Sequence, residues 1–151
     1  MKWITRERPK IDRIACPWLV QRFVDPSAEF LFVPKGDVLA AAKETGAIPF
    51  DVPDAELTHD GDFCSFDAFM LKYKLKNPAL ERLALIVRGA DTDRDNLAPE
   101  CAGLLAITLG LAATFQDDHE LLKQGFLVYD ALYKWSQSLT TERHGWYPEK
   151  M

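Results

Sequence analysis

Basic and acidic side chains crowd the turn that follows the first predicted strand. In open α/β sheets, ligands bind beyond the carboxyl ends of the strands, and the free N–H groups at a helix start add donors for an anion. Arginine also offers two parallel donors to a tetrahedral or planar anion. We therefore predict a ligand site for a small oxyanion, formed by Arg6, Arg8, Lys10, Asp12 and Arg13. The alternative is a solvated turn in which the acidic side chains pair with the arginines.

A second candidate site combines Glu56, His59 and Asp91. Glu and His three positions apart share one face of a helix and can both reach one metal ion. A third ligand must come from elsewhere, and the acidic loop 89–95 offers Asp91. These residues predict a site for one divalent transition-metal ion, either iron, manganese or zinc. The alternative is that His59 and the nearby carboxylates are solvated in a polar loop.

Cys16 stands directly before Pro17, where we expect a helix to begin. A thiol at a helix N-terminus has a lowered pKa, so a redox or nucleophilic role is one hypothesis and a buried structural cysteine is the other. The chain has three cysteines and no CxxC pair. This pattern argues against a disulfide framework and a cysteine zinc site, and it favours a reducing compartment.

Alternating strands and helices are predicted for the N-terminal part of the chain. Pro17 fits the first turn of a helix, and Gly46 ends the next helix. Strands are expected at residues 2–5, 28–33 and 48–52, the second being apolar enough to be buried on both faces. Strand, helix, strand, helix, strand makes two right-handed crossovers. The fold class is therefore α/β, with a small, mostly parallel three-stranded sheet.

Helical signals dominate after residue 53. We expect N-caps at Ser65, Asn77 and Asp117, each followed by apolar residues at helical spacing. A further helix over residues 100–113 is rich enough in Leu and Ala to be buried almost all round. These helices form a C-terminal layer that covers the sheet. We expect a single domain spanning residues 1–151.

Composition limits the partners of this domain. The net charge of -5 and the sequence pI of about 5.2 argue against nucleic-acid binding, because that affinity comes mainly from Lys and Arg neutralising phosphates. No segment approaches the roughly 20 apolar residues of a membrane span, and no apolar signal-type stretch follows Met1. We expect a cytoplasmic protein without a membrane partner.

Five segments of the chain together resemble one known family. They lie at residues 3–19, 49–53, 64–69, 88–94 and 129–133. In this order they are similar to the chromate-resistance domain found at the C-terminus of chromate-resistance protein B. The resemblance implies a part in chromate resistance and the stress response, where longer members are chromate-responsive regulators of an efflux transporter. The chain begins at the domain itself, so we expect it to act without a DNA-binding region.

Three functional hypotheses follow. The first is a module that senses or binds chromate or a related oxyanion through the basic turn. The second is a metal-dependent redox enzyme that acts on chromate or reactive oxygen species, with the metal ligands named above. The third is a structural or partner-binding domain whose helical layer forms a homodimer. Metal analysis separates the second hypothesis from the first.

Overall fold

The computed structural model describes residues 1–146. Its sheet contains β1 (Lys2–Arg6), β2 (Glu29–Val33) and β3 (Ile48–Pro49), and β1 pairs in parallel with both neighbours in the order β2-β1-β3. This confirms the predicted small parallel sheet. The predicted domain limit at residue 151 lies outside the described residues.

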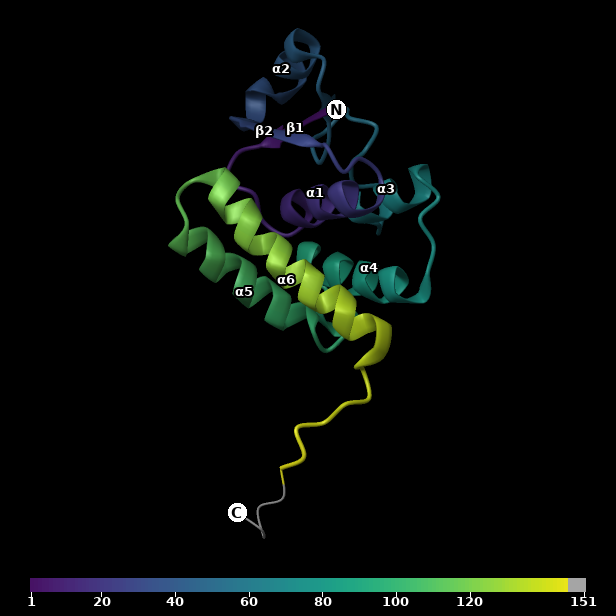
Figure 1. Ribbon diagram of the computed structural model, residues 1–151. Coiled ribbons are helices and arrows are strands. Elements are labelled where there is room, and N and C mark those ends of the chain that lie inside the picture. The colour runs from purple at the N-terminus through teal and green to yellow at the C-terminus, as the bar shows by residue number, and fades with distance from the viewer. Residues whose placement is uncertain (147–151) are drawn as a thin grey trace.

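Helices surround this sheet and account for most of the chain (Figure 1). Two short 3-10 turns, Lys35–Asp37 and Asp95–Leu97, precede α2 and α5. The α-helices are α1 (Asp12–Phe23), α2 (Val38–Thr45), α3 (Ser65–Lys72), α4 (Pro78–Asp91), α5 (Cys101–Thr114) and α6 (Asp118–Ser138).

The layers are stacked with α2 on one side of the sheet and α1 on the other, followed by α4, α5 and α6 (Figure 1). Alternation along β1 explains this order, because successive side chains of a strand point to opposite faces. Trp3 enters the large core on the α1 side, whereas Ile4 packs with Val38 and Ala42 of α2. The helix that lies directly against this face of the sheet is therefore α1, and the predicted C-terminal helical layer packs on the far side of α1.

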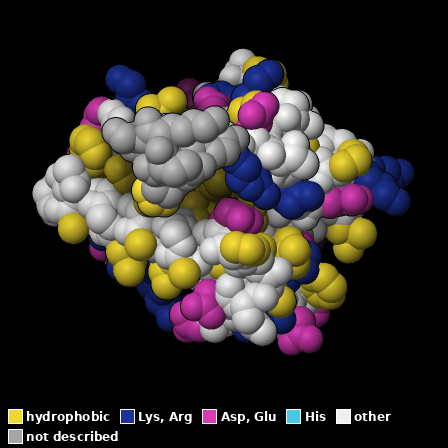
Figure 2. Space-filling model, turned by 90° about the horizontal axis from the view of Figure 1, so that it is seen from below, with side chains coloured by type: hydrophobic (Ala, Val, Ile, Leu, Met, Phe, Trp, Pro, Cys, Tyr) yellow, Lys and Arg dark blue, Asp and Glu magenta, His cyan; other side chains and the backbone are white. Residues whose placement is uncertain are grey.

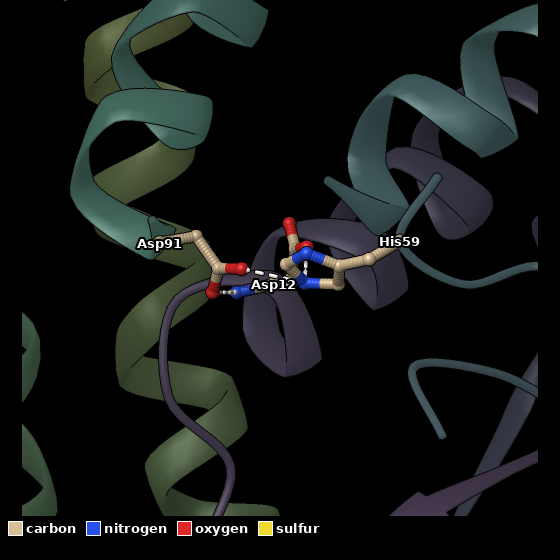
Figure 3. A group of neighbouring side chains, drawn as sticks. All are labelled: Asp12, His59 and Asp91. Carbon is tan, nitrogen blue, oxygen red and sulfur yellow. Dashed lines mark hydrogen bonds and ion pairs between the residues drawn. The ribbon is translucent and has the colours of Figure 1, made fainter. Parts of the chain in front are cut away.

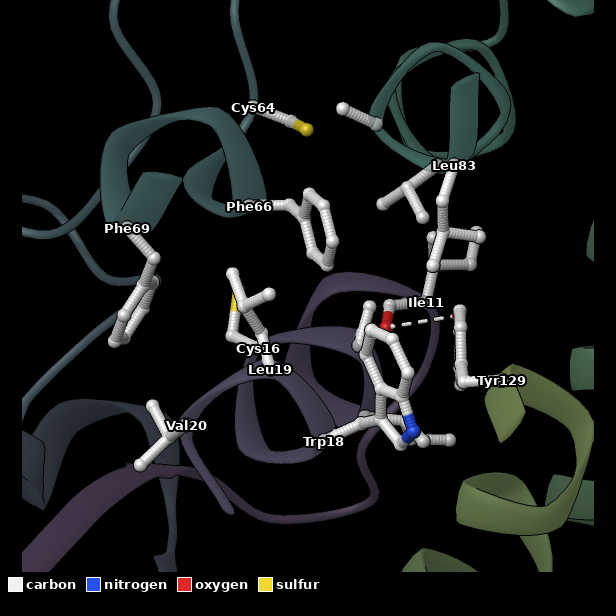
Figure 4. Close-up of a cluster of buried hydrophobic side chains, with 14 of the residues drawn as sticks. Ile11, Cys16, Trp18, Leu19, Val20, Cys64, Phe66, Phe69, Leu83 and Tyr129 are labelled. Atoms are coloured by element: carbon white, nitrogen blue, oxygen red, sulfur yellow. Dashed lines mark hydrogen bonds between the residues drawn. The ribbon is translucent and has the colours of Figure 1, made fainter. Parts of the chain in front are cut away.

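The large core lies where α1 meets α3, α4 and α6 (Figure 4). Trp18 and Leu19 of α1 are fully buried, as are Phe66 of α3 and Leu83 of α4. Tyr129 of α6 is also buried, and its hydroxyl donates a hydrogen bond to the carbonyl oxygen of Ile11 at 3.3 Å. This bond ties the last long helix to the residue that precedes α1.

The start of α1 differs from the prediction. Pro17 lies inside the helix, which begins at Asp12. The earlier start is possible because the first turn is closed by the Ile11 carbonyl, which accepts hydrogen bonds from the amides of Ile14 and Ala15. Pro17 then removes only one hydrogen bond. As a consequence, Asp12 and its neighbour Arg13 belong to a buried first turn rather than to a surface loop.

Two predictions about the strands were also wrong. β2 is not buried on both faces, since only Phe30 of its residues is buried and the strand lies at the edge of the sheet. β3 ends at Pro49 instead of residue 52. Asp51 has a φ of 55°, which an extended strand does not permit, and the chain turns there.

The helix ends were predicted with mixed success. Asn77 and Asp117 are N-caps whose side chains accept backbone hydrogen bonds, and Gly46 is the left-handed C-cap of α2, all as predicted. The N-cap of α3 is Cys64 rather than Ser65. The Ser65 hydroxyl instead donates to Asp51 at 2.6 Å. This change matters because it directs Ser65 towards the candidate site.

The prediction that the α5 helix is buried almost all round was wrong. One side of α5 is buried through Cys101, Leu104, Thr108 and Ala112. On the two flanks of this buried side, Ile107 and Leu109 are 50% and 48% exposed. Seen from this helical end of the molecule, hydrophobic side chains lie among charged ones on the surface (Figure 2). Among the described residues, no helix is long and apolar enough to cross a membrane.

Candidate functional site

A cavity of about 600 Å³ opens beside the carboxyl ends of the three strands. Parallel strands bring the residues that follow them to one edge of the sheet, which is where ligands bind in open α/β folds. Arg6 ends β1, Lys35 follows β2 and Asp51 follows β3. The cavity is lined by Arg6, Lys10, Arg13, Lys35, Asp51, Val52, Pro53, Asp54, Thr58, His59 and Asp91.

One wall of the cavity is acidic and centres on His59 (Figure 3). The Nε2 atom of His59 lies 2.8 Å from Oδ2 of Asp91, 3.4 Å from Oδ1 of Asp51 and 3.5 Å from Oδ2 of Asp12. These side chains come from four separate places: the start of α1, the turn after β3, the loop before α3 and the last residue of α4. The fold therefore gathers one imidazole and three carboxylates at one point.

The carboxylates of this wall are held by hydrogen bonds from α3. Asp12 is fully buried, and its Oδ2 atom accepts a hydrogen bond from the backbone amide of Ser65 at 2.7 Å. The amide of Phe66 donates to the other oxygen at 3.4 Å. A helix N-terminus presents free N–H groups and a partial positive charge, so it stabilises a buried carboxylate there. Ser65 fixes Asp51 at the same time through its hydroxyl.

Burial shifts the protonation of this wall. Desolvation raises the pKa of Asp12 and of Asp91, and the nearby carboxylate of Asp51 adds to the rise at both. Hydrogen bonding to Asp12 and Asp51 raises the pKa of His59 to about 10. The imidazole is therefore a cation at neutral pH when no other cation is present.

The other wall of the cavity is basic. Arg13 is only 7% exposed, and burial followed by the nearby charge of Arg6 lowers its pKa. Its Nε atom lies 3.8 Å from Oδ2 of Asp51, which is a weak ion pair. Its Nη1 atom and the Nε atom of Arg6 are buried and have no hydrogen-bond partner within residues 1–146. Buried N–H donors without a partner are rare and costly, so these atoms call for an acceptor.

Most of the predicted oxyanion residues meet at this cavity, but Arg8 does not line it. The Arg8 guanidinium points to the end of α5, where it donates to the carbonyl oxygens of Ala112, Phe115 and Gln116 at 2.5, 3.0 and 2.7 Å. Arg6, Lys10 and Arg13 line the cavity, and Asp12 joins the acidic wall.

The predicted metal ligands are brought together only in part. His59 and Asp91 are in contact, whereas Glu56 points away and pairs with Lys72 at 2.8 Å. The prediction assumed that Glu56 and His59 share a helical face, but the described chain between β3 and α3 contains no helix. Asp91 is the last residue of α4 rather than part of a loop. Asp12 takes the place that Glu56 was expected to fill.

Asp51 and Lys35 are two of the cavity residues that the sequence analysis missed. Each follows a strand of the parallel sheet, and that position is a signal which could have identified both. The reactive role considered for Cys16 is not supported. Cys16 is fully buried inside α1, and desolvation raises the pKa of its thiol well above the ordinary value.

Three of the six non-glycine residues with positive φ in the described chain lie at or beside the acidic wall. Ile11, Asp51 and Asp54 have φ angles of 43°, 55° and 70°. Such conformations cost of order 1–3 kcal/mol each in residues other than glycine, and they cluster at functional sites. Ile11 is the N-cap of α1, so its conformation sets the direction in which Asp12 enters the helix.

Comparison with known proteins adds to this geometry. The family described as ChrB, C-terminal domain, matches residues 3–136. This chain belongs to that family. Protein ChrB of Cupriavidus metallidurans is 34% identical over 133 residues, which cover 87% of this chain and 40% of that protein. The chain thus spans less than half the length of this curated ChrB relative. No solved structure matches the chain.

The match to the ChrB C-terminal domain confirms the family resemblance stated for the sequence. It includes every element from β1 to nearly the end of α6. All the residues of the acidic and basic walls lie within the matched range. The candidate site is therefore part of the domain on which the family is defined.

Proposed function

We propose that this domain acts in chromate resistance by binding chromate, or a related oxyanion, in the cavity between Arg6 and Arg13. The observation that carries the proposal is the Nη1 atom of Arg13, a buried donor without a partner in the described chain, in a residue that lines the cavity. Membership of the ChrB C-terminal domain family supports the choice of chromate as the anion.

The charges around Arg13 support an anion of this kind. Two guanidinium groups close enough to lower the pKa of Arg13 repel each other, and an anion between them relieves that repulsion. Lys10 and Lys35 add exposed positive charge at the cavity edge. Chromate is a tetrahedral dianion that accepts several charge-assisted hydrogen bonds, each worth about 1.5–3 kcal/mol.

The three cysteines are all free, which supports a role in the reducing cytoplasm. Binding, for sensing or sequestration, is the function that we propose.

Isothermal titration of the untagged protein with chromate and with sulfate tests this proposal. We expect heat on titration with chromate and at least about a tenfold loss of affinity in Arg13→Ala. Arg6→Ala, at a half-buried position, provides a second variant if Arg13→Ala folds poorly. Arg82→Ala removes an exposed arginine outside the cavity and should leave the affinity unchanged. Absence of chromate binding, or unchanged affinity in both cavity variants, would contradict the proposal.

The exposed side of α5 favours self-association as a second property. The helix contains no charged residue, and Ile107 and Leu109, which lie on opposite flanks of its buried side, are each about half exposed. A second copy of the chain offers the same apolar surface, as a two-fold symmetric dimer requires. Light scattering of the protein and of Ile107→Glu tests this idea. A wild-type protein that stays monomeric at 100-fold different concentrations would rule it out.

A further inference from the structure

We propose that Asp12, His59 and Asp91 bind one divalent transition-metal ion, and that this ion strengthens the binding of an oxyanion by the arginines opposite. The part concerning the anion rests on the proposed function, whereas the metal site stands by itself. The site differs from the one predicted by sequence, because Asp12 replaces Glu56 as a ligand.

The positions of the ligand atoms fit one metal ion. One atom from each of Asp12, His59 and Asp91 can be chosen so that all lie within 4.8 Å of one another. Metal–nitrogen and metal–oxygen bonds of about 2.0–2.2 Å place neighbouring ligands about 3–3.5 Å apart. His59 Nε2 already lies 2.8 Å from Asp91 and 3.5 Å from Asp12. Small rotations of the side chains around His59, which is 40% exposed, complete the geometry.

The ligands are supported in the way that metal sites require. Ligating carboxylates are generally held by hydrogen bonds from a second layer of residues, which fix their orientation. Here the amide of Ser65 donates to Asp12, and the amide of Asp12 donates to Asp91 at 3.4 Å. Asp51 lies 3.4 Å from His59 Nε2 and is oriented by the Ser65 hydroxyl, so it can supply a fourth ligand.

The types of ligand indicate which ions fit. One imidazole and two or three carboxylates suit manganese, iron or zinc, whereas soft ions such as Cu(I) prefer sulfur. The nearby thiol of Cys64 is committed elsewhere, since it donates to Asp67 at 3.3 Å within the cap of α3. Three protein ligands leave coordination positions open towards the cavity, where water or an oxyanion can bind.

Arg13 provides the independent observation that links the metal to an anion. It is more than nine-tenths buried, lines the same cavity as His59 and Asp91, and has an Nη1 atom without a partner among residues 1–146. Its Nε atom is only 3.8 Å from Asp51, so the basic and acidic walls meet. An anion held by Arg13 must therefore approach the carboxylates of the acidic wall.

This closeness predicts a coupling between the two ligands. Without a metal ion, the acidic wall presents only carboxyl oxygens, and no electrophilic centre, to an incoming dianion. A bound divalent ion adds positive charge at this wall and offers an electrophilic centre to an anion oxygen. By thermodynamic reciprocity, an anion must tighten the binding of the metal by the same factor. We expect a factor of about 5 to 150, the usual range of such couplings.

The metal site is tested with untagged protein stripped of metal by a chelator and titrated with Zn²⁺, an ion without redox chemistry of its own. We expect one ion per chain and at least a tenfold loss of affinity in His59→Ala and in Asp91→Asn. Glu56→Ala is the matched control and should bind Zn²⁺ as tightly as the wild type. His59 and Asp91 are not core apolar residues, and thermal melting verifies that both variants fold. Zn²⁺ binding that is absent, or unaffected in both variants, overturns the metal site.

The coupling is tested by titrating chromate, and separately sulfate, into the metal-free and the Zn²⁺-loaded protein. Tighter binding of the anion by the loaded protein, lost in Asp91→Asn, supports the inference. Equal anion affinities with and without Zn²⁺ overturn the coupling but leave the proposed function intact. The Arg13→Ala variant should bind Zn²⁺ as tightly as the wild type but should lose its affinity for the anion. If no anion binds in either state while Zn²⁺ does, the proposed function fails and the metal site survives.

Discussion

Arg8 and Asp118, 110 positions apart in the sequence, meet at 3.0 Å where α5 ends and α6 begins. The same guanidinium closes the end of α5 by donating to the carbonyl oxygen of Ala112 in its last turn and to those of Phe115 and Gln116, which follow the helix. Helix ends leave such carbonyls without partners, and a cation there also interacts favourably with the helix dipole. Arg8 therefore joins the N-terminal turn to the helical layer.

Replacing Arg8 should thus affect stability rather than binding. We expect Arg8→Ala to lower the free energy of unfolding by about 1–3 kcal/mol, because several charge-assisted hydrogen bonds are lost from a partly exposed group. Urea unfolding measures this change, with Arg82→Ala as the exposed control. The affinity for chromate should remain within about twofold of the wild type. A variant as stable as the wild type would show that these bonds contribute little.

Two glycines should respond to alanine in opposite directions. A Cβ atom at Gly125 would lie 2.5 Å from Cγ2 of Ile14, so α6 must move away from α1. We expect Gly125→Ala to destabilise the fold by about 1–3 kcal/mol. Gly110 has open space around it on α5, and Gly110→Ala should stabilise the helix by about 0.5–1 kcal/mol. Thermal or urea unfolding of both variants would refute this packing if the changes had the same sign.

The Asp130 carboxylate should make the free energy of unfolding depend on pH in the acidic range. Arg22 first, and then the indole of Trp18, lower the pKa of Asp130 below the ordinary aspartate value of about 3.9. A carboxylate with a lowered folded-state pKa stabilises the protein above the unfolded-state pKa, and this contribution disappears as the pH falls through the folded-state value. The pair is partly exposed, so we expect less than about 1 kcal/mol.

Asp130→Asn tests this contribution. Its destabilisation should be present at pH 7 and should shrink as the pH falls below about 4. The Trp18 Nε1–H group donates to Asp130 at 2.7 Å, so its NMR shift should follow the same titration in the wild type. A titration midpoint at or above the ordinary aspartate value would contradict the prediction.

The three thiols should be unreactive in the native protein. Cys16, Cys64 and Cys101 are fully buried, and desolvation raises the pKa of each. Since the thiolate is the nucleophile, a thiol-reactive dye should modify none of them until the protein unfolds, after which all three should react. Fast labelling of a single cysteine at neutral pH would indicate an exposed thiol that this fold does not have.

Much of the fold could be predicted from local patterns. The three parallel strands and the helices capped by Asn77 and Asp117 follow from side-chain periodicity and capping, which depend on neighbouring residues alone. The start of α1 could not be predicted in this way. It depends on the Ile11 carbonyl, which is held by the hydroxyl of Tyr129 from the other end of the chain.

For the candidate site, the sequence by itself determined the types of residue and identified several of them. These are the run of cations after the first strand, one histidine and the aspartate at position 91. Only the tertiary structure decided which of these side chains meet at the site. It sent Arg8 and Glu56 elsewhere and added Asp12 and Asp51 to His59. The physical reason is that the acidic wall is assembled from four separate segments of the chain. The order of the strands, and the α3 amides that donate to Asp12, set the point at which these segments meet. Neither feature can be read from the spacing of residues along the chain.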